Sequence, residues 1–266
     1  MSVGPVSVGG ALMRVVILGI FGLMFGSFLT VVIARLPEHR SVVVPRSSCV
    51  ACGAVIRPRD NIPVFSYAWL RGRCRGCHGR ISFLYPAVEA VTGALFVAVG
   101  LASGDPWRDA LLAPFLGILL AAAVIDIRHR IIPNRLVYAA VVMFGLFLLV
   151  AQLAHAGPHL LGAAIGFLMY GGSLFVVAVA VPGGMGMGDV KLAALIGMVL
   201  GSLGLSYVAV AGMASVLAGG LGAAMALLAG RSRRQTIPFG PYLAAGATVA
   251  SLFGARLAAW YGGLLH

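Results

Sequence analysis

Eight long apolar runs, separated by short polar breaks, dominate this sequence. The hydrocarbon core of a bilayer is about 30 Å thick, so a helix needs about 20 mainly apolar residues to cross it. Eight runs meet this requirement: 13–34, 84–102, 109–126, 135–154, 159–181, 190–205, 207–229 and 241–262. Because 61% of the 266 residues are hydrophobic and only 10% are charged, we expect an all-α integral membrane protein with about eight transmembrane helices.

The basic residues predict the orientation of these helices, because short cytoplasmic loops collect Lys and Arg. Each span carries the chain to the opposite side of the membrane. If the polar segment 35–83 is cytoplasmic, three other breaks between spans are therefore cytoplasmic as well: 127–134, 182–189 and 230–240. These four segments and their flanks hold sixteen of the nineteen Lys and Arg residues, which leaves three for the outer side: Arg14, Arg108 and Arg256. We therefore expect the N-terminus outside. We interpret the net charge of +12 as a basic face toward anionic membrane lipid, with no nucleic-acid partner.

The polar segment 35–83 contains every cysteine of the chain, in the pairs CVAC and CRGC. Two Cys-x-x-Cys pairs can offer four thiolates to one tetrahedral Zn²⁺, here Cys49, Cys52, Cys74 and Cys77. The alternative is a pair of disulfides or redox dithiols, which a reducing cytoplasmic location disfavours. So short a segment has too little core to be stable alone. A zinc ion would therefore supply folding free energy in a structural role.

Seven acidic residues are present, and three lie near or inside the apolar layer: Glu89, Asp126 and Asp189. An ionisable residue at membrane depth is costly and is therefore a functional candidate. The other four are expected to be ordinary solvated residues: Glu38, Asp60, Asp105 and Asp109. Asp126 ends the third predicted span and Asp189 precedes the sixth, so both belong to the cytoplasmic end of the bundle. Two carboxylates in a partly dry site share one proton, which suits the acid and base roles of an aspartic protease.

Each of these two aspartates also has a structural alternative. Asp189 could be the N-cap of the helix that follows it, and Asp126 could pair with Arg128 or Arg130. Neither alternative explains the glycines before Asp189, which give an extended peptide room to approach: Gly183, Gly184, Gly186 and Gly188. Helices in a bilayer hide their peptide bonds, so a membrane protease needs such an opening for substrate and water.

Five stretches of the sequence, in order, resemble the type IV prepilin peptidases. The stretch GMGMGDVKLAALIGMVLG contains the Gly-x-Gly-Asp signature of intramembrane aspartic proteases. The others resemble the first span, the cysteine loop, the first aspartate region and the last span of the family: FGSFLTVVIARLP, CVACGAVIRPRDNIPVFSYAWLRGRCRGCHGRISFLYPAVE, IDIRHRIIPN and IPFGPYLAAG. The resemblance covers nearly the whole chain. One small departure is Thr30, where an Asn would be common.

The resemblance implies a bifunctional leader peptidase and N-methyltransferase of the bacterial plasma membrane, with Asp126 and Asp189 as the catalytic pair at the cytoplasmic face. Its substrates would be prepilins or pseudopilins of pilus or type II secretion machinery, cleaved after a leader glycine. The new N-terminus would then be methylated with S-adenosyl-L-methionine. The implied organisation is a first span in 1–34, a cysteine loop in 35–83 and a peptidase bundle in 84–266.

For the methylation step, Glu89 is a candidate partner of a positively charged amine or sulfonium, because an unpaired Glu in a span needs a reason. A structural ion pair with Arg73 or Arg80 is its alternative. Three other interpretations of the whole chain stay open: a peptidase without methyltransferase activity, a multi-pass transporter, and a non-enzymatic zinc-bearing assembly factor. A transporter would scatter its acids at mid-membrane. An assembly factor would need the cysteines but not the aspartates.

Overall fold

The computed structural model describes residues 8–181, 185–229 and 238–264, and these residues fold into helices joined by turns. Apart from two isolated antiparallel bridges, regular structure in this part of the chain is helical, which confirms the all-α class. The chain forms two compact units, Met1–Ala121 and Ala122–His266, and the division falls inside α4 (Pro106–His129).

Seven helices in the described ranges are long and apolar enough to cross a membrane: Gly9–Arg35, Leu84–Ser103, Pro106–His129, Asn134–Leu153, Leu160–Ala180, Leu205–Leu228 and Gly240–Trp260. They correspond to seven of the eight predicted runs, so the chain is a multi-pass membrane protein. The remaining run, 190–205, corresponds to α8 (Met187–Gly201), which has 15 residues and a length of about 22 Å. Every residue from Leu192 to Gly201 is buried, so the apolar sequence of α8 reflects packing against protein.

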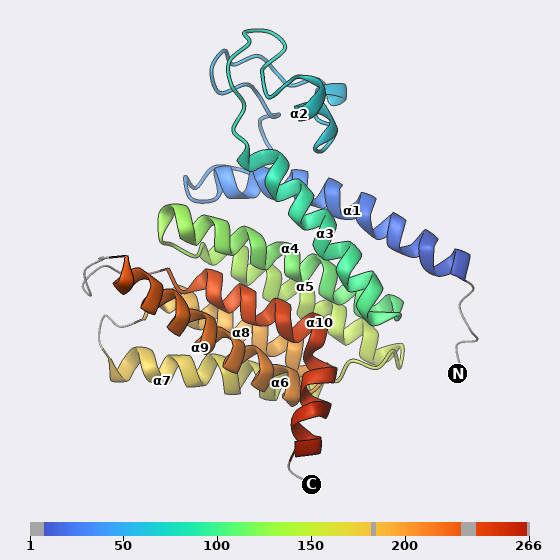
Figure 1. Cartoon of the computed structure of the whole chain (residues 1–266), viewed down its shortest axis with the longest axis vertical. Helices are drawn as coiled ribbons and strands as arrows, with labels where there is room; N and C mark the ends of the chain where they lie inside the picture. The colour runs from blue at the N-terminus through green and yellow to red at the C-terminus, as the bar shows by residue number, and fades with distance from the viewer. Residues whose placement is uncertain (1–7, 182–184, 230–237, 265–266) are drawn as a thin grey trace. The chain divides into compact units, whose positions relative to one another are not determined.

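In the first unit, α1 (Val8–Arg35) and α3 (Leu84–Ser103) lie side by side, as the blue and green helices of Figure 1 show. A Cβ atom on Gly22 would lie 2.8 Å from the Cα atom of Gly93, and one on Gly26 would lie 2.8 Å from the Cα atom of Glu89. Small residues let helix backbones approach this closely, and the resulting van der Waals contact stabilises helix pairs in lipid. The glycines of α1 thus fix its packing against α3.

A buried polar cluster joins α1, α3 and the first turn of α4 in the first unit. The Arg14 guanidinium donates to the Gly100 carbonyl oxygen at 2.7 Å and lies 3.5 Å from Oδ2 of Asp109. The Ser103 hydroxyl donates to the same carboxylate. Asp109 is only 3% exposed, so the expectation that it is an ordinary solvated residue is wrong. Its cationic partner lies on another helix, and sequence spacing does not show such a pair.

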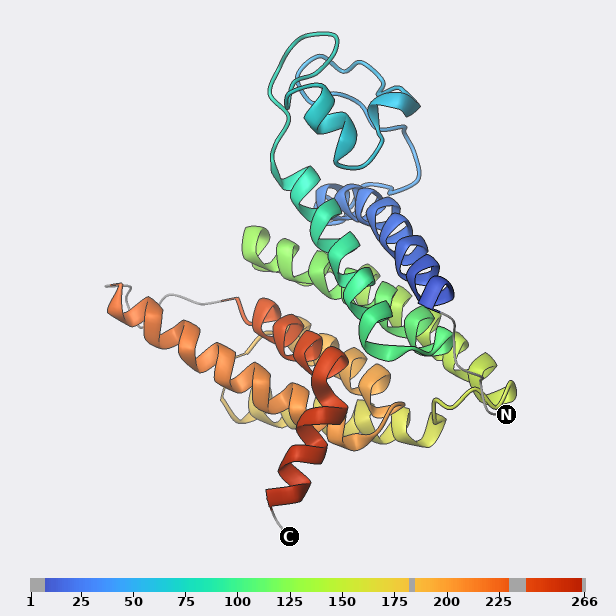
Figure 2. The same cartoon turned by 45° about the vertical axis from the view of Figure 1, so that its right-hand side comes forward.

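In the second unit, α6 (Leu160–Gly166), η2 (Phe167–Gly171) and α7 (Gly172–Ala180) form one apolar helix that packs against α8 (Figure 2). Any Cβ atom on Gly166 would overlap the Gly197 carbonyl oxygen, and one on Gly162 would overlap that of Gly201. The two backbones are therefore in direct contact.

Three further helices complete the second unit: α5 (Asn134–Leu153), α9 (Leu205–Leu228) and α10 (Gly240–Leu264). The helices α9 and α10 pack along each other. A widened, π-helical turn at η2 carries Tyr170, whose hydroxyl donates to Oγ of Ser215 in α9 at 3.1 Å. This bond links the helix packed on one side of α8 to α9.

Candidate active site and metal centre

Asp126 lies in the last turns of α4 and is 5% exposed. Its Oδ2 atom accepts a hydrogen bond of 2.9 Å from the backbone N–H of Gly240, the first residue of α10. The first N–H groups of a helix have no partner inside that helix, so they are free to bind such an oxygen. A Cβ atom on Gly240 would lie 2.8 Å from Oδ2, and this position therefore favours glycine. The contact fixes the orientation of the carboxylate.

Asp189 lies in the first turn of α8 and is half-buried. The N-cap of α8 is Gly186, whose carbonyl oxygen accepts the Asp189 N–H at 3.1 Å. The alternative that Asp189 is the N-cap is therefore wrong, although its carboxylate accepts a hydrogen bond from the backbone N–H of Gly186, the N-cap residue.

Two glycines let the start of α8 pack closely. A Cβ atom on Gly188 would lie 3.0 Å from Cβ of Ile132, and one on Gly186 would lie 3.3 Å from Oδ2 of Asp189. The other two glycines named from the sequence, Gly183 and Gly184, lie outside the described residues.

Both aspartates belong to the second unit, and their carboxylates lie within electrostatic range of each other. In the ranges that the structure describes, no ion pair joins Asp126 to Arg128 or Arg130. The structure therefore brings together the two acids selected from the sequence and leaves Asp126 without the basic partner considered as its alternative. Two neighbouring carboxylates without a cation can hold one proton between them.

A further polar contact near Asp189 was not anticipated from the sequence. The Nζ atom of Lys191 donates to Oδ1 of Asn134 at 2.9 Å and lies 5.3 Å from the ring centroid of Tyr138. Both partners lie at the start of α5, so this lysine ties the start of α8 to the start of α5. In the sequence Lys191 was only one of the basic residues assigned to the membrane face. Its position two residues after Asp189 is the signal that could have identified it.

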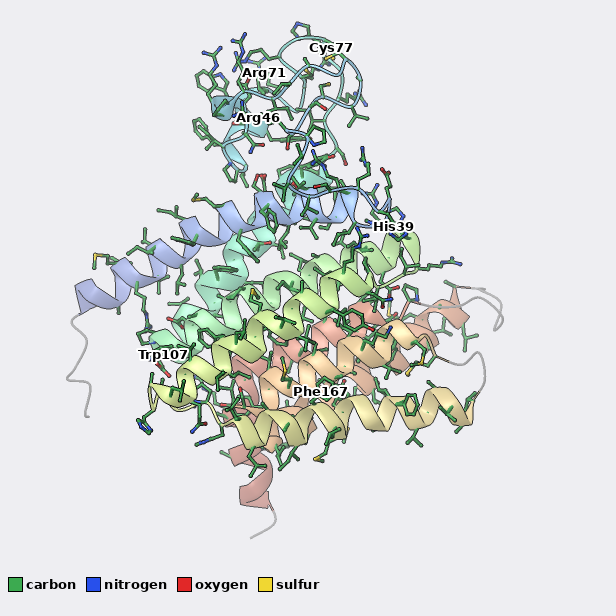
Figure 3. The ribbon with its side chains drawn as sticks, turned by 180° about the vertical axis from the view of Figure 1, so that it is seen from behind. His39, Arg46, Arg71, Cys77, Trp107 and Phe167 are labelled. Carbon is green, nitrogen blue, oxygen red and sulfur yellow. The ribbon has the colours of Figure 1, made fainter. Side chains whose placement is uncertain are left out.

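The cysteine loop connects α1 to α3 and contains η1 (Pro58–Asp60) and α2 (Phe65–Trp69). An antiparallel bridge encloses each cysteine pair, Ser48 with Val55 and Arg73 with Arg80. The bridges fold both Cys-x-x-Cys pairs into turns, and Cys77 is labelled in this loop in Figure 3.

All four cysteine sulfurs lie within 4.8 Å of one another, and the residues are free thiols: Cys49, Cys52, Cys74 and Cys77. Sulfur ligands at about 2.3 Å from a tetrahedral zinc ion are about 3.8 Å apart, and the Cys49 and Cys77 sulfurs are separated by 3.8 Å. The backbone N–H groups of Cys52 and then Ala51 lower the pKa of the Cys49 thiol to about 6. The cluster can therefore hold a metal ion, and these cysteines form no disulfide. The alternative of redox dithiols stays a prediction.

Glu89 is buried in α3, in the first unit. Its Oε2 atom accepts a hydrogen bond of 2.7 Å from the backbone N–H of Val64. Val64 has a φ of +60°, which β-branched residues rarely adopt. No ion pair with Arg73 or Arg80 is present among the described residues, so the ion-pair alternative for Glu89 is also wrong. The carboxylate instead binds a strained backbone position of the cysteine loop.

Comparison with known families gives two matches along the chain. Residues 20–103 match the Bacterial Peptidase A24 N-terminal domain, and residues 110–228 match the Type IV leader peptidase family. The first match includes the cysteine loop and Glu89, and the second includes both aspartates.

Curated relatives match over most of their length. The chain is 41% identical over 245 residues to a Prepilin leader peptidase/N-methyltransferase of Bacillus subtilis (strain 168), covering 92% of this chain and 96% of the relative. It is 35% identical over 268 residues to the protein of the same name from Aeromonas hydrophila, covering 91% of each chain. Over 273 residues it is 34% identical to the one from Pseudomonas aeruginosa, again covering 91% of each chain. No solved structure matches the chain significantly.

Proposed function

Because this chain belongs to the type IV leader peptidase family, we propose that it cleaves the leader peptide of type IV prepilins or pseudopilins and then methylates the new N-terminus. The observation that carries the peptidase activity is the pairing of Asp126 and Asp189 at the ends of two helices, within electrostatic range and, among the residues that the structure describes, with no ion pair to Asp126. A scaffold has no need of such a pair, and a transporter would place its acids deeper in the membrane.

In the proposed reaction, the ionised carboxylate of the pair takes a proton from a water molecule. The resulting hydroxide attacks the scissile carbonyl carbon, while the protonated carboxyl group donates its proton to the carbonyl oxygen. The C–N bond of the tetrahedral intermediate then breaks, and the leaving nitrogen takes up the proton removed from water. One hydroxyl of the intermediate returns a proton to the other carboxylate, which restores the singly protonated pair. The Gly240 N–H holds Asp126 in position through these steps, because its hydrogen bond fixes one carboxylate oxygen.

The glycines at the start of α8 support access of substrate. Gly186 and Gly188 bring no side chain between the Asp189 carboxylate and an extended peptide, and a hydrolase in a bilayer must admit both the peptide bond and water. We place this opening at the cytoplasmic face of the bacterial inner membrane. The concentration of Lys and Arg in the segments that flank both aspartates supports this orientation.

Zn²⁺ is the metal we propose for the cysteine cluster, held by Cys49, Cys52, Cys74 and Cys77 in a structural role. Four thiolates satisfy a tetrahedral ion and leave no open position for water. The ion would hold the two turns of the loop together, because each turn supplies two of its ligands.

We further propose that the Glu89 carboxylate binds a cation of the methylation step, either the substrate amine or the sulfonium of S-adenosyl-L-methionine. That cofactor, when bound, supplies an electrophilic methyl group. The Glu89→Gln variant tests the role of charge, because glutamine keeps an oxygen that can accept the Val64 N–H. We expect methylation to fall at least about tenfold while leader cleavage stays near wild type. Unchanged methylation in a folded variant would limit Glu89 to its contacts inside the protein, with the Val64 N–H and the Ser27 hydroxyl.

The peptidase proposal is tested with purified wild type, Asp126→Asn and Asp189→Asn, each mixed with a prepilin and labelled S-adenosyl-L-methionine. Each substitution keeps the shape of the side chain and removes its ability to ionise. We expect both variants to lose cleavage by at least about 10³-fold, because the two carboxylates act as one unit. If either folded variant cleaves at a rate near wild type, the two-aspartate mechanism is wrong.

A further inference from the structure

The helix α2 exposes its apolar side chains and buries a polar one. Phe65 is 62% exposed and Trp69 is 72% exposed, while Ser66 between them is buried. The Ser66 hydroxyl accepts from the Ile62 N–H and donates to the Arg59 carbonyl oxygen, both at 3.0 Å. In a loop surrounded by water this arrangement is unfavourable, because a large aromatic side chain gains free energy when it leaves water.

Phe65 and Trp69 form one continuous surface, which we call the aromatic face of α2. Their side chains are one helical turn apart, with ring centroids separated by 6.2 Å and planes inclined by 19°. The described part of the first unit leaves most of both side chains uncovered.

Two contacts hold α2 beside the membrane-spanning helix α3. The Val64 N–H, directly before α2, donates to Glu89, which lies five residues beyond Leu84 at the start of α3. At about 1.5 Å per residue, this contact is about 7–8 Å along the span from its first residue. The Tyr67 ring also meets the Phe83 ring edge-on, with centroids 6.3 Å apart. The start of α2 therefore lies level with the first turns of a transmembrane helix.

Exposed arginines flank the aromatic face on both sides in the sequence: Arg57, Arg59, Arg71 and Arg73. Arg71 follows α2 closely and is labelled in Figure 3. Aromatic rings that sit at headgroup level, next to cations that attract anionic lipid, are typical of the bilayer interface. The flanking positive charges and the depth of α2 thus both favour lipid of the bilayer interface as the partner of the aromatic face.

We propose that the aromatic face of α2 inserts into the interfacial layer of the bilayer and anchors the cysteine loop to lipid. Phe65 and Trp69 contact the headgroup and upper acyl region, and Arg71 and Arg73 contact anionic headgroups. The loop is then fixed at its two ends, by the contact of Val64 with Glu89, and by the aromatic face. This role is independent of the proposed peptidase activity.

Fluorescence quenching by lipid tests the proposal. The full-length protein with Trp107→Phe and Trp260→Phe keeps Trp69 as its sole tryptophan, and it is reconstituted into phosphatidylcholine vesicles containing some phosphatidylglycerol and lipid brominated near the headgroup. We expect quenching comparable to that of a positive control that keeps only Trp260, an exposed residue of the last span. The negative control carries Val50→Trp as its sole tryptophan, since Val50 is 95% exposed in the cysteine loop and lies outside the aromatic face.

Quenching of Trp69 as weak as in the Val50→Trp control would overturn the proposal and indicate that water or another polypeptide contacts the aromatic face. If the multiple substitutions impair folding, the loss of quenching from wild type to Trp69→Phe gives the same comparison with one conservative change. In that measurement, the fluorescence intensity lost to the brominated lipid should be smaller in Trp69→Phe than in wild type, and an equal loss of intensity would overturn the proposal. Prepilin cleavage by each variant serves only as the check that the protein is folded.

Discussion

Gly240 lies so close to Asp126 that its lack of a side chain is a requirement of the proposed active site. In Gly240→Ala, the new methyl group would be 2.8 Å from the Oδ2 atom in the present geometry, so the carboxylate or the start of α10 must move. A displacement of about 1 Å can cost about 100-fold in rate. We expect prepilin cleavage by Gly240→Ala to fall about 10- to 100-fold, measured on purified protein under single-turnover conditions.

Gly220→Ala is the matched control for this experiment. Gly220 lies in α9, and a Cβ atom there would meet nothing within 4 Å. Alanine at an open helical position stabilises a helix by about 0.5–1 kcal/mol, so this variant should keep wild-type cleavage. Equal activity of the two variants would show that the close contact between Gly240 and Asp126 is not required.

At the level of single residues, the sequence identifies candidate functional side chains well. It predicts their hydrogen-bond and ion-pair partners less well. Asp126 and Asp189 stand out because acids are rare in apolar runs. The donor to Asp126 is a backbone N–H 114 residues away. Every residue except proline has such a group, so the sequence does not show which one binds Asp126; it shows only that position 240 is a glycine. The same limit applies to Glu89, for which an arginine partner was considered and whose partner is the Val64 amide.

Where α6 and α8 pack together, backbone lies against backbone and leaves no room for an added methyl group. Gly162 and Gly166 on one helix oppose Gly201 and Gly197 on the other, with backbone atoms in contact. In Gly166→Ala a methyl group would overlap the Gly197 carbonyl oxygen, so the helices must separate. We expect the free energy of unfolding to fall by about 1–3 kcal/mol, measured by denaturant titration in mixed micelles.

A second glycine of the same unit provides the comparison. A Cβ atom added to Gly145 in α5 would meet nothing within 4 Å, so Gly145→Ala should leave stability unchanged or slightly raised. If Gly166→Ala were as stable as Gly145→Ala, α6 and α8 would not be held by backbone contact. The spacing of four residues within each glycine pair is visible in the sequence, but the pairing of α6 with α8 is not.

For the molecule as a whole, composition predicts the fold class well, because a bilayer permits few backbone arrangements. Apolar runs of sufficient length predict helices, and seven of the described helices have membrane length. The helix α8 differs from this prediction, because its apolar run is buried in protein. The sequence alone does not distinguish burial in protein from burial in lipid. The buried pair of Arg14 with Asp109 was missed for a related reason, since it joins two helices through tertiary packing.

The cysteine cluster leads to a prediction about the intact protein. If the cluster holds zinc, purified protein contains one zinc ion per chain, and removing it with a chelator unfolds the cysteine loop, because metal binding supplies the folding free energy of so small a segment. Trypsin should then cut the loop after its exposed arginines at least about tenfold faster, since cleavage follows the population of the open form.

Cys52→Ser should reproduce both effects, the loss of zinc and the faster cleavage by trypsin. Val50→Ala, an exposed change in the same turn, should alter neither the zinc content nor the rate of cleavage. Protein that retains full resistance to trypsin without metal would show that the two bridged turns are stable by themselves.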